Sequence, residues 1–382
     1  MKNRQLFLLL SASALSTMSY GVMFTMLDDF RDKYSIAESK LGLIVAAGFI
    51  TGFLANVLIA PFADKGHAKK LILLGVSMEI IGALTMAFGG SFPILLLGRF
   101  LTGLGSGSSE PASRRLIILA NPNDMGRNLG LSVSAGIAGF SLGPILSAVT
   151  VGAFGLAAPF LIIVVMLSVV LVGITQLRVT EAEIEDAPTQ RLAFDLLKNR
   201  AILGIVFIGV SLFVMIGTFD SIWSVMMDDI HAPTWVASVG ITVFALPMLF
   251  LAPVGGRFTQ TFGPYKASIY GLTLGSLFMI LYGTIGIPYI MLGIGLFHGM
   301  VDGLTITGGS AAIALVAPQQ RLASAQGLYG GLQTLTGGIT AGLAGLTYEH
   351  IGRGTFLACS ALMMLLIATG SWIARDYLKI KG

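Results

Sequence analysis

The chain has 382 residues, of which 55% are hydrophobic and only 11% are charged, and its mean hydropathy is +0.86. Soluble proteins carry roughly a quarter charged residues because water wets their surface, so this composition excludes a water-soluble globular protein. The single cysteine, Cys359, excludes an internal disulfide and a cysteine-based metal site. The basic residues behind the net charge of +4 are scattered in short groups, a pattern that does not indicate nucleic-acid binding.

Apolar runs long enough to cross a bilayer recur along the whole chain. A helix needs about 20 residues to span ~30 Å of hydrocarbon, and this length predicts twelve transmembrane helices. The first run follows Lys2 and Arg4 as a signal peptide would, but it is too long for one, so it is expected to be the first span. The predicted spans are 6–27, 41–63, 70–90, 93–118, 128–150, 154–177, 201–226, 235–256, 267–286, 288–317, 322–348 and 353–374.

Lysines and arginines are distributed unevenly between the loops that join these spans. If both termini lie in the cytoplasm, nearly all loop cations fall on the cytoplasmic side, and only Arg31, Lys33, Lys40 and Arg353 fall outside. The opposite orientation inverts this ratio. We therefore expect a multi-pass protein of the cytoplasmic (inner) membrane with both termini in the cytoplasm.

One polar stretch, residues 178–200, interrupts the apolar pattern near the middle of the chain. It predicts a cytoplasmic linker between an N-terminal bundle, 1–177, and a C-terminal bundle, 201–382, of six helices each. The last part of the linker, 193–200, is expected to form a short amphipathic helix. The two halves also repeat each other, which predicts pseudo-symmetric bundles. The repeated pairs are 60–65 with 252–257 and 122–130 with 318–327.

The loop after the second span carries an acid among several cations. It reads Ala60-Pro-Phe-Ala-Asp64-Lys65-Gly-His67-Ala68-Lys69-Lys70. This resembles the loop motif G-x-x-x-D-R-x-G-R-R of the major facilitator superfamily, with departures at positions 60, 67 and 68. An acid at a helix end can hold one bundle to the other through ion pairs and helix dipoles. The resemblance gives Asp64 and Lys65 this role, although an ordinary positively charged cytoplasmic loop remains the alternative.

The second half contains a related loop after the eighth span. It runs through Gly256, Arg257 and Gly263 and has Gln260 where the acid would stand. A neutral amide binds a helix terminus less strongly than a carboxylate does. We therefore expect this loop to hold the bundles together more weakly.

The fourth span contains Arg99-Phe-Leu-Thr-Gly103-Leu-Gly105-Ser-Gly107, which is similar to the R-x-x-x-G-x-G motif of the proton-coupled members of the family. An arginine at membrane depth is costly, so it must face protein, water or an acid. The resemblance implies that Arg99 takes part in proton or conformational coupling. A purely structural bond to backbone carbonyls is the alternative.

The fifth span contains Gly136-Ile-Ala-Gly139-Phe-Ser-Leu-Gly143-Pro144, which resembles the G-x-x-x-G-P motif of the family's proton-exchanging exporters. Gly139 and Gly143 share a helix face and allow a neighbouring helix to approach, while Pro144 bends the helix. The motif's usual Gly-Gly continuation is Ser147-Ala148 here. The resemblance therefore favours antiport.

Four acidic residues fall inside predicted spans, where a charged side chain is energetically unfavourable. Burial favours the neutral form of a carboxyl group, so such a group can take up and release a proton near neutral pH. In the family the first, fourth, seventh and tenth helices line the central cavity, which favours Glu110, Asp220 and Asp302 as proton or substrate ligands. Glu79 is not expected to be a ligand because the third helix of the family lies more peripherally. The four acids are Glu79, Glu110, Asp220 and Asp302.

Two of these acids have helical neighbours of complementary chemistry. His298 lies four residues before Asp302, so the two share a helix face and can couple protonation to substrate charge. Glu110 lies four residues before Arg114, so a structural ion pair is its alternative role. For Asp220 and Asp302 the alternative is a polar contact between helices.

The sequence thus predicts an all-α membrane protein of the major facilitator fold that exports a small drug or metabolite in exchange for protons. Proton symport or facilitated uptake of a nutrient is the main alternative, and a non-transporting membrane sensor is the alternative from another class. No catalytic motif and no phosphate-binding loop of the Walker type occurs, so we expect neither an enzyme nor a cofactor or metal. The expected partners are a small molecule, slightly favoured to be cationic or neutral, protons and lipid, and the chain is expected to be a monomer.

Overall fold

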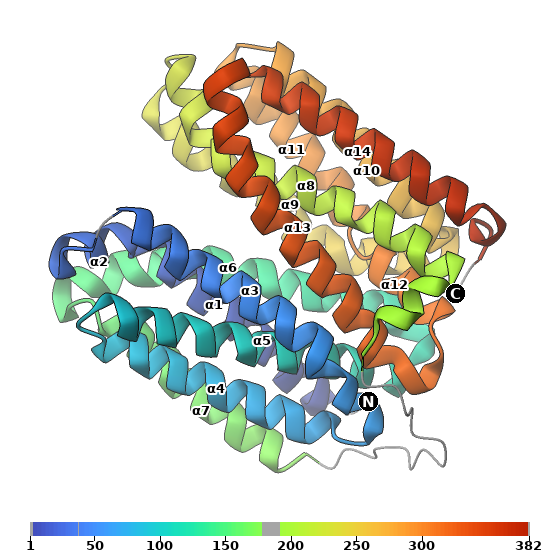
Figure 1. Cartoon of the computed structure of the whole chain (residues 1–382), viewed down its shortest axis with the longest axis horizontal. Coiled ribbons are helices and arrows are strands. Elements are labelled where there is room, and N and C mark those ends of the chain that lie inside the picture. The colour runs from blue at the N-terminus through green and yellow to red at the C-terminus, as the bar shows by residue number, and fades with distance from the viewer. Residues whose placement is uncertain (1–2, 37, 178–191, 381–382) are drawn as a thin grey trace. The chain divides into compact units, whose positions relative to one another are not determined.

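The computed structural model describes residues 3–36, 38–177 and 192–380, and every regular element in these ranges is helical (Figure 1). The long helices correspond one to one with the predicted spans except at the tenth. They are α1 (Asn3–Thr25), α3 (Glu38–Leu58), α4 (Ala68–Phe88), α5 (Phe92–Ala120), α6 (Met125–Phe154), α7 (Ala158–Thr175), α8 (Arg200–Asp229), α9 (Thr234–Phe262), α10 (Pro264–Thr284), α11 (Pro288–Thr305), α13 (Leu322–Ile351) and α14 (Gly354–Ile373).

Shorter helices complete the described part of the chain. The tenth predicted span is broken, because α11 ends at Thr305 and the short helix α12 (Gly308–Val316) begins after Ile306 and Thr307. Outside the predicted spans lie α2 (Leu27–Tyr34) and five 3-10 turns. These turns are η1 (Ala60–Lys65), η2 (Pro122–Asp124), η3 (Phe194–Lys198), η4 (Gln319–Arg321) and η5 (Arg375–Tyr377). The turn η3 stands where a short amphipathic helix was expected; residues 178–191 of the predicted linker lie outside the described residues.

Ten helical segments of the described chain are long and apolar enough to cross a membrane. The α11–α12 pair counts as one of these segments, Pro288–Val316. The two remaining predicted spans, α5 and α13, are also long enough. Their composition is more polar, since α5 contains Arg99 and Glu110 and α13 is rich in glycine and threonine.

Equivalent turns end the fifth and eleventh predicted spans. Gly155 follows α6 with φ 83°, and Gly352 follows α13 with φ 52°. Glycine adopts this left-handed conformation, which commonly ends helices, without the steric cost of a Cβ. The same chemistry thus ends corresponding helices in both halves, as expected for a duplicated chain.

The helices form two compact units, which we call unit 1 and unit 2. Unit 1 contains Met1–Asn121, Ala135–Ala193 and Pro318–Gly331, and unit 2 contains Pro122–Ser134, Phe194–Ala317 and Leu332–Gly382. Each unit therefore includes a short piece from the other half of the sequence. The first part of α6 belongs to unit 2, and the first part of α13 belongs to unit 1.

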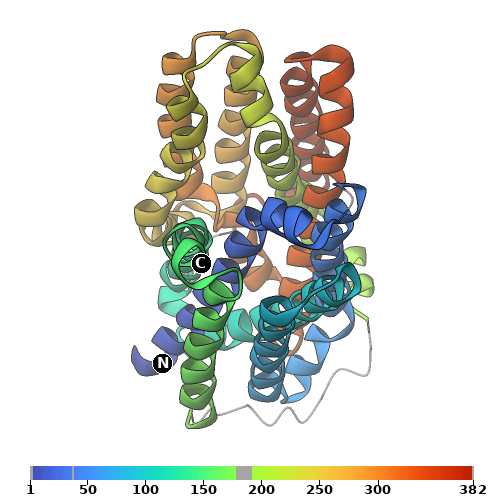
Figure 2. The same ribbon diagram turned by 90° about the vertical axis from the view of Figure 1, so that its left-hand side faces the viewer.

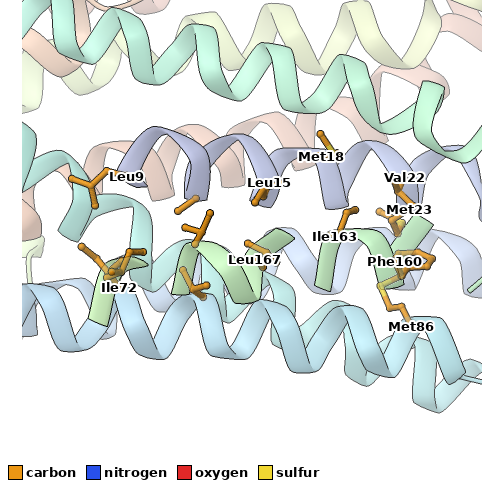
Figure 3. Packing of buried hydrophobic residues seen from close by; sticks show 14 of the residues in the cluster. Leu9, Leu15, Met18, Val22, Met23, Ile72, Met86, Phe160, Ile163 and Leu167 are labelled. Atoms are coloured by element: carbon orange, nitrogen blue, oxygen red, sulfur yellow. The ribbon is translucent and has the colours of Figure 1, made fainter. Parts of the chain in front are cut away.

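The core of unit 1 lies between α1, α4 and α7. The side chains of Phe160, Ile163 and Leu167 on α7 have no exposed surface and pack against residues of α1 and α4, such as Val22 and Ile72 (Figure 3). Helix α4 meets α5 through small residues: a Cβ on Gly75 would come 2.8 Å from Cβ of Ser109, and one on Gly82 would come 2.7 Å from the carbonyl oxygen of Gly98. Such close backbone approach is typical of helices packed within a membrane.

Unit 2 is built in a similar way, with its long helices running alongside one another (Figure 2). Helix α14 packs against α8 and α10, and α11 packs against α9 and α10. The hydroxyl of Tyr265 on α10 donates to the carbonyl oxygen of Ala201 on α8 over 2.8 Å, and Ser360 on α14 donates to that of Ser276 over 2.8 Å. Side-chain hydrogen bonds between buried helices thus supplement packing in this unit.

Candidate functional site: ionisable residues within the helices

The carboxylate of Asp64 lies at the N-terminus of α13, within unit 1. Its oxygens accept hydrogen bonds from the backbone N–H groups of Ala323 (2.9 Å) and Ser324 (2.7 Å) and from the Ser324 hydroxyl (2.6 Å). Arg115 Nε donates to the same carboxylate over 3.0 Å, and Asp64 has no exposed surface. The first N–H groups of a helix lack partners inside the helix and carry a positive partial charge. Asp64 therefore provides the N-terminal cap that α13 does not supply from its own sequence.

The lysines of this loop make other contacts. Lys65 Nζ lies 5.6 Å from the ring centroid of Phe62, and Lys69 Nζ donates to the carbonyl oxygens of Thr175 (2.8 Å) and Leu177 (2.7 Å) at the end of α7. Lys70 is exposed. The cation that pairs with Asp64 is thus Arg115, which was not among the predicted site residues. The adjacent arginines 114 and 115 at the end of the fourth span were the available signal.

The related segment of the second half was expected to be a loop after residue 256, but it forms the last turns of α9, which continues to Phe262, and it contacts the N-terminus of α6 within unit 2. Gln260 Oε1 accepts from the backbone N–H of Gly126 (2.9 Å), and its Nε2 donates to the carbonyl oxygen of Pro122 (3.1 Å). The backbones of Gly126 and Gly256 are too close to admit a Cβ on either. Arg257 Nη2 lies 3.6 Å from Asp124 Oδ1 in an exposed pair.

The two related segments therefore make the same kind of contact, but with side chains of different charge. Each places an oxygen-bearing side chain against the first turn of a helix from the other half of the sequence, a carboxylate in one case and an amide in the other. Gly263 ends α9 with φ 114°, and its N–H donates to the carbonyl oxygen of Thr259 (3.1 Å).

Arg99 is buried inside unit 1, with 1% of its surface exposed. Its guanidinium carbon lies 3.6 Å from the ring centroid of Tyr20 on α1, a distance typical of a cation–π contact. Gly48 on α3 leaves the space that the guanidinium occupies. Arg99 Nε and Nη2 have no hydrogen-bond acceptor among the described residues.

The glycines of the arginine motif face two different helices. Gly103 and Gly107 pack on α3, where a Cβ on Gly107 would come 2.8 Å from Cβ of Ala55. Gly105 faces α4, where its Cβ would come 2.7 Å from Cγ of Glu79. The motif therefore brings α5 close to both neighbours at once.

The glycine and proline motif of α6 packs against α1, within unit 1. A Cβ on Gly143 would come 2.7 Å from both the carbonyl oxygen of Met18 and the amide nitrogen of Val22, and Gly139 lies against Ala14 in the same way. A Cβ added to Gly21 on α1 would lie 3.2 Å from Cδ of Pro144. These small residues set the separation of α6 from the first predicted span.

His298 and Asp302 form a buried pair in unit 2. Their exposed fractions are 0% and 1%, and His298 Nε2 lies 3.6 Å from Asp302 Oδ2. The other imidazole nitrogen lies 3.4 Å from the Tyr282 hydroxyl, and Nε2 lies 3.1 Å from Met215 Sδ. Rings of α9 and α10 enclose the imidazole, those of Phe244 and Phe278 at 5.0 and 4.8 Å between centroids. Asp302 Oδ2 has no hydrogen-bond partner among the described residues.

The remaining candidate acids are more accessible. Glu110 on α5 keeps 34% of its side chain exposed and pairs with Arg114 over 3.3 Å, as the four-residue spacing predicts. Asp220 on α8 is exposed. Glu110 belongs to unit 1, and Asp220 and Asp302 belong to unit 2.

Long apolar helices, buried ionisable residues and repeated halves in the described part of the chain define a polytopic membrane protein. The sequence profile of the Major Facilitator Superfamily matches residues 9–225 and 205–381, and the chain belongs to this family. It is accordingly a membrane transporter of small molecules and not an enzyme.

Individual relatives and solved structures agree with this family. The chain is 23% identical over 362 residues to the fosmidomycin resistance protein of Escherichia coli (strain K12), a match that covers 92% of this chain and 88% of the relative. The human organic anion transporter MFSD10 superposes with a TM-score of 0.78 at 15% identity, covering 96% of this chain and 99% of that one. The proton:xylose symporter XylE superposes with a TM-score of 0.78 at 12% identity, covering 97% and 96%. The prediction of two six-helix bundles of the major facilitator fold is confirmed.

Proposed function

We propose that this transporter exports a small organic molecule in exchange for protons by alternating access. The bundles 1–177 and 201–382 are the proposed moving bodies, joined by the linker 178–200 and set as a monomer in the cytoplasmic (inner) membrane with both termini in the cytoplasm. The relative named for fosmidomycin resistance supports export of an antibiotic-sized molecule. The glycine and proline motif of α6 supports exchange over symport.

The observation that carries the proposal is the buried pair of His298 and Asp302. Asp302 is buried beside an imidazole that aromatic rings and a thioether surround, so its ionised form is costly, and a bound proton removes that cost. The pair can therefore hold a proton in one state of the transporter and release it when water or substrate reaches it. Asp220 on α8 and Glu110 and Arg99 on α5 are the proposed further ligands for protons or substrate.

The contacts of Asp64 and Gln260 are the proposed conformational elements. Asp64 lies in the first half of the sequence and α13 in the second, so their contact holds the two halves together at the predicted cytoplasmic end. Gln260 joins the halves again through α6. Breaking both contacts is the proposed step that opens the transporter to the cytoplasm, and Arg115 stabilises the closed arrangement by pairing with Asp64.

Proteoliposomes with an imposed pH gradient test the direction of coupling. We expect labelled fosmidomycin to accumulate when the interior is acidic, because protons then leave as substrate enters. A thermal-shift screen of drugs, sugars and metabolites supplies the transported probe if fosmidomycin does not bind. If a bound probe is transported and the pH gradient does not change its accumulation, the proposal is refuted.

Proton symport is the second candidate, supported by the fold shared with a proton:xylose symporter. The same vesicles separate the two functions. Symport predicts accumulation when the exterior, not the interior, is acidic.

A further inference from the structure

The third predicted span contains a buried acid that the proposed mechanism does not yet use. Glu79 on α4 has 2% of its surface exposed, inside unit 1. It stands between Gly75 and Gly82, the two glycines through which α4 meets α5. Its methylene stem packs on Gly105, the second glycine of the arginine motif. The carboxyl group therefore lies in the contact between two helices and not against lipid.

The polar neighbours of Glu79 are neutral. Ser109 Oγ on α5 lies 3.4 Å from Oε1, and Ser16 on α1 is a second hydroxyl neighbour. Oε2 makes no direct hydrogen bond with the described residues. An ionised carboxylate in this position is thus only partly compensated.

The charged groups on the surrounding elements do not neutralise Glu79 either. Glu110 on α5 is the neighbouring acid, and its charge has the same sign as that of an ionised Glu79. On α5, Arg114 pairs with Glu110, Arg115 pairs with Asp64 and Arg99 stacks on Tyr20. Helix α7 contains no ionisable residue. The remaining ionisable residues of the neighbouring elements are Arg4 and Tyr20 on α1 and Asp64 and Lys65 on η1.

We propose that Glu79 is a second proton-binding carboxyl group of the transport cycle, in unit 1, distinct from the His298–Asp302 pair of unit 2. Its carboxylate takes up one proton from water and returns the same proton in the other half of the cycle. Glu110, which is partly exposed and follows Ser109 directly, is the residue through which water reaches it. This inference rests on the proposed proton coupling.

Helix α1 connects this carboxyl group to the arginine motif. Ser16 and Tyr20 are four residues apart and share one face of α1, so Ser16 contacts Glu79 while Tyr20 stacks on Arg99. A proton on Glu79 changes the hydrogen bond with Ser16 and so changes the position of the helix that carries Tyr20. Proton binding at Glu79 thereby changes the contact between Tyr20 and the guanidinium of Arg99.

Glu79→Gln tests the assignment because glutamine keeps the shape of a protonated glutamate but cannot release a proton. Glu349→Gln, at an exposed position near the end of α13, is the matched control. In proteoliposomes loaded with the probe that wild type transports, we expect Glu79→Gln to lose accumulation driven by the pH gradient and to retain exchange of labelled for unlabelled probe. The control is expected to keep both activities.

The outcomes separate this inference from the proposed function. If wild type itself is not driven by a pH gradient, the proposed function fails. If wild type is driven and Glu79→Gln is driven equally well, only the role of Glu79 fails.

An infrared titration of the full-length protein in detergent gives a readout that does not depend on transport. We expect the carbonyl stretch of a protonated carboxyl group to titrate in wild type, to disappear in Glu79→Gln and to persist in Glu349→Gln. If Glu79→Gln does not fold, Glu79→Asp keeps the acid, and its carboxyl band is expected to titrate at a shifted pH. A set of carboxyl bands that is unchanged by the folded variant would overturn the inference.

Discussion

Asp64 and Ser324 are 260 positions apart in the sequence, yet the Asp64 carboxylate accepts hydrogen bonds from both the backbone N–H and the hydroxyl of Ser324, at 2.7 and 2.6 Å. Short hydrogen bonds to a carboxylate are stronger than those between neutral groups. Among the contacts at the predicted cytoplasmic end, we therefore expect the loss of this one to lower the stability of the protein most.

Asp64→Asn removes the charge and keeps the size of the side chain. The amide keeps one acceptor oxygen for the first turn of α13 but presents a donor to Arg115, leaving that buried cation without its partner. We expect the free energy of unfolding to fall by about 1–3 kcal/mol. Thermal unfolding in detergent measures it, and Asp376→Asn, which alters an exposed pair with Arg375, is the control expected to be neutral. Equal stability of the two variants would contradict this role for Asp64.

Gln260→Glu introduces the charge that the second loop lacks. A carboxylate beside the N–H of Gly126 interacts favourably with the N-terminus of α6, by about 0.3–1 kcal/mol. It also replaces the amide that donates to the carbonyl oxygen of Pro122 with a second acceptor, and this lost hydrogen bond costs about 1–3 kcal/mol in a buried position. We therefore expect lower thermal stability and faster transport, because the closed arrangement is weakened. Unchanged stability and transport would mean that the Gln260 contact does not restrain opening.

Gly143→Ala tests the packing of α6 on α1. A methyl group at this position would lie 2.7 Å from backbone atoms of Met18 and Val22, which cannot move aside as a flexible side chain can. Overpacking of this kind costs about 1–3 kcal/mol. Gly152→Ala on the same helix is the control, because a Cβ there has no neighbour within 4 Å. A stable Gly143→Ala protein would show that this contact has room to relax.

Much of this architecture follows from hydropathy and motif spacing. Twelve apolar runs were sufficient to place the long helices. The cost of a buried arginine predicted that Arg99 faces protein, water or an acid, and the structure places it over the ring of Tyr20. The break of the tenth span at Ile306 and Thr307 was not predicted, because the run from 288 to 317 is apolar without an internal proline or charged pair that marks a helix end.

The partners of the site residues depend on contacts that sequence patterns do not encode. Arg115 lies 51 positions from Asp64, so no helical spacing relates the two, and the loop's own Lys65 was the nearer candidate. Glu79 was not among the predicted ligands because the third helix of the resembling family lies more peripherally, and the hydropathy of α4 does not indicate which face meets α5. The glycines on both helices, Gly75 and Gly105, were the signal that could have placed it at a helix contact.

Asp302→Asn removes the carboxyl group that is proposed to bind a proton in the buried pair of unit 2. The amide stays neutral at every pH, so His298 loses its ionisable partner. We expect accumulation driven by a pH gradient to disappear while the protein remains folded and probe exchange persists. His298→Gln is expected to weaken the coupling less, because Asp302 remains. Full gradient-driven accumulation by Asp302→Asn would remove the pair from the proposed proton pathway.

The exchange of substrate for protons is tested most directly by wild-type protein in liposomes that contain a pH-sensitive dye and start without a pH gradient. Addition of a transported probe, fosmidomycin first, is predicted to make the interior more alkaline as protons leave while the probe enters. Acidification of the interior, or measured entry of the probe with no change of internal pH, would contradict proton-coupled export.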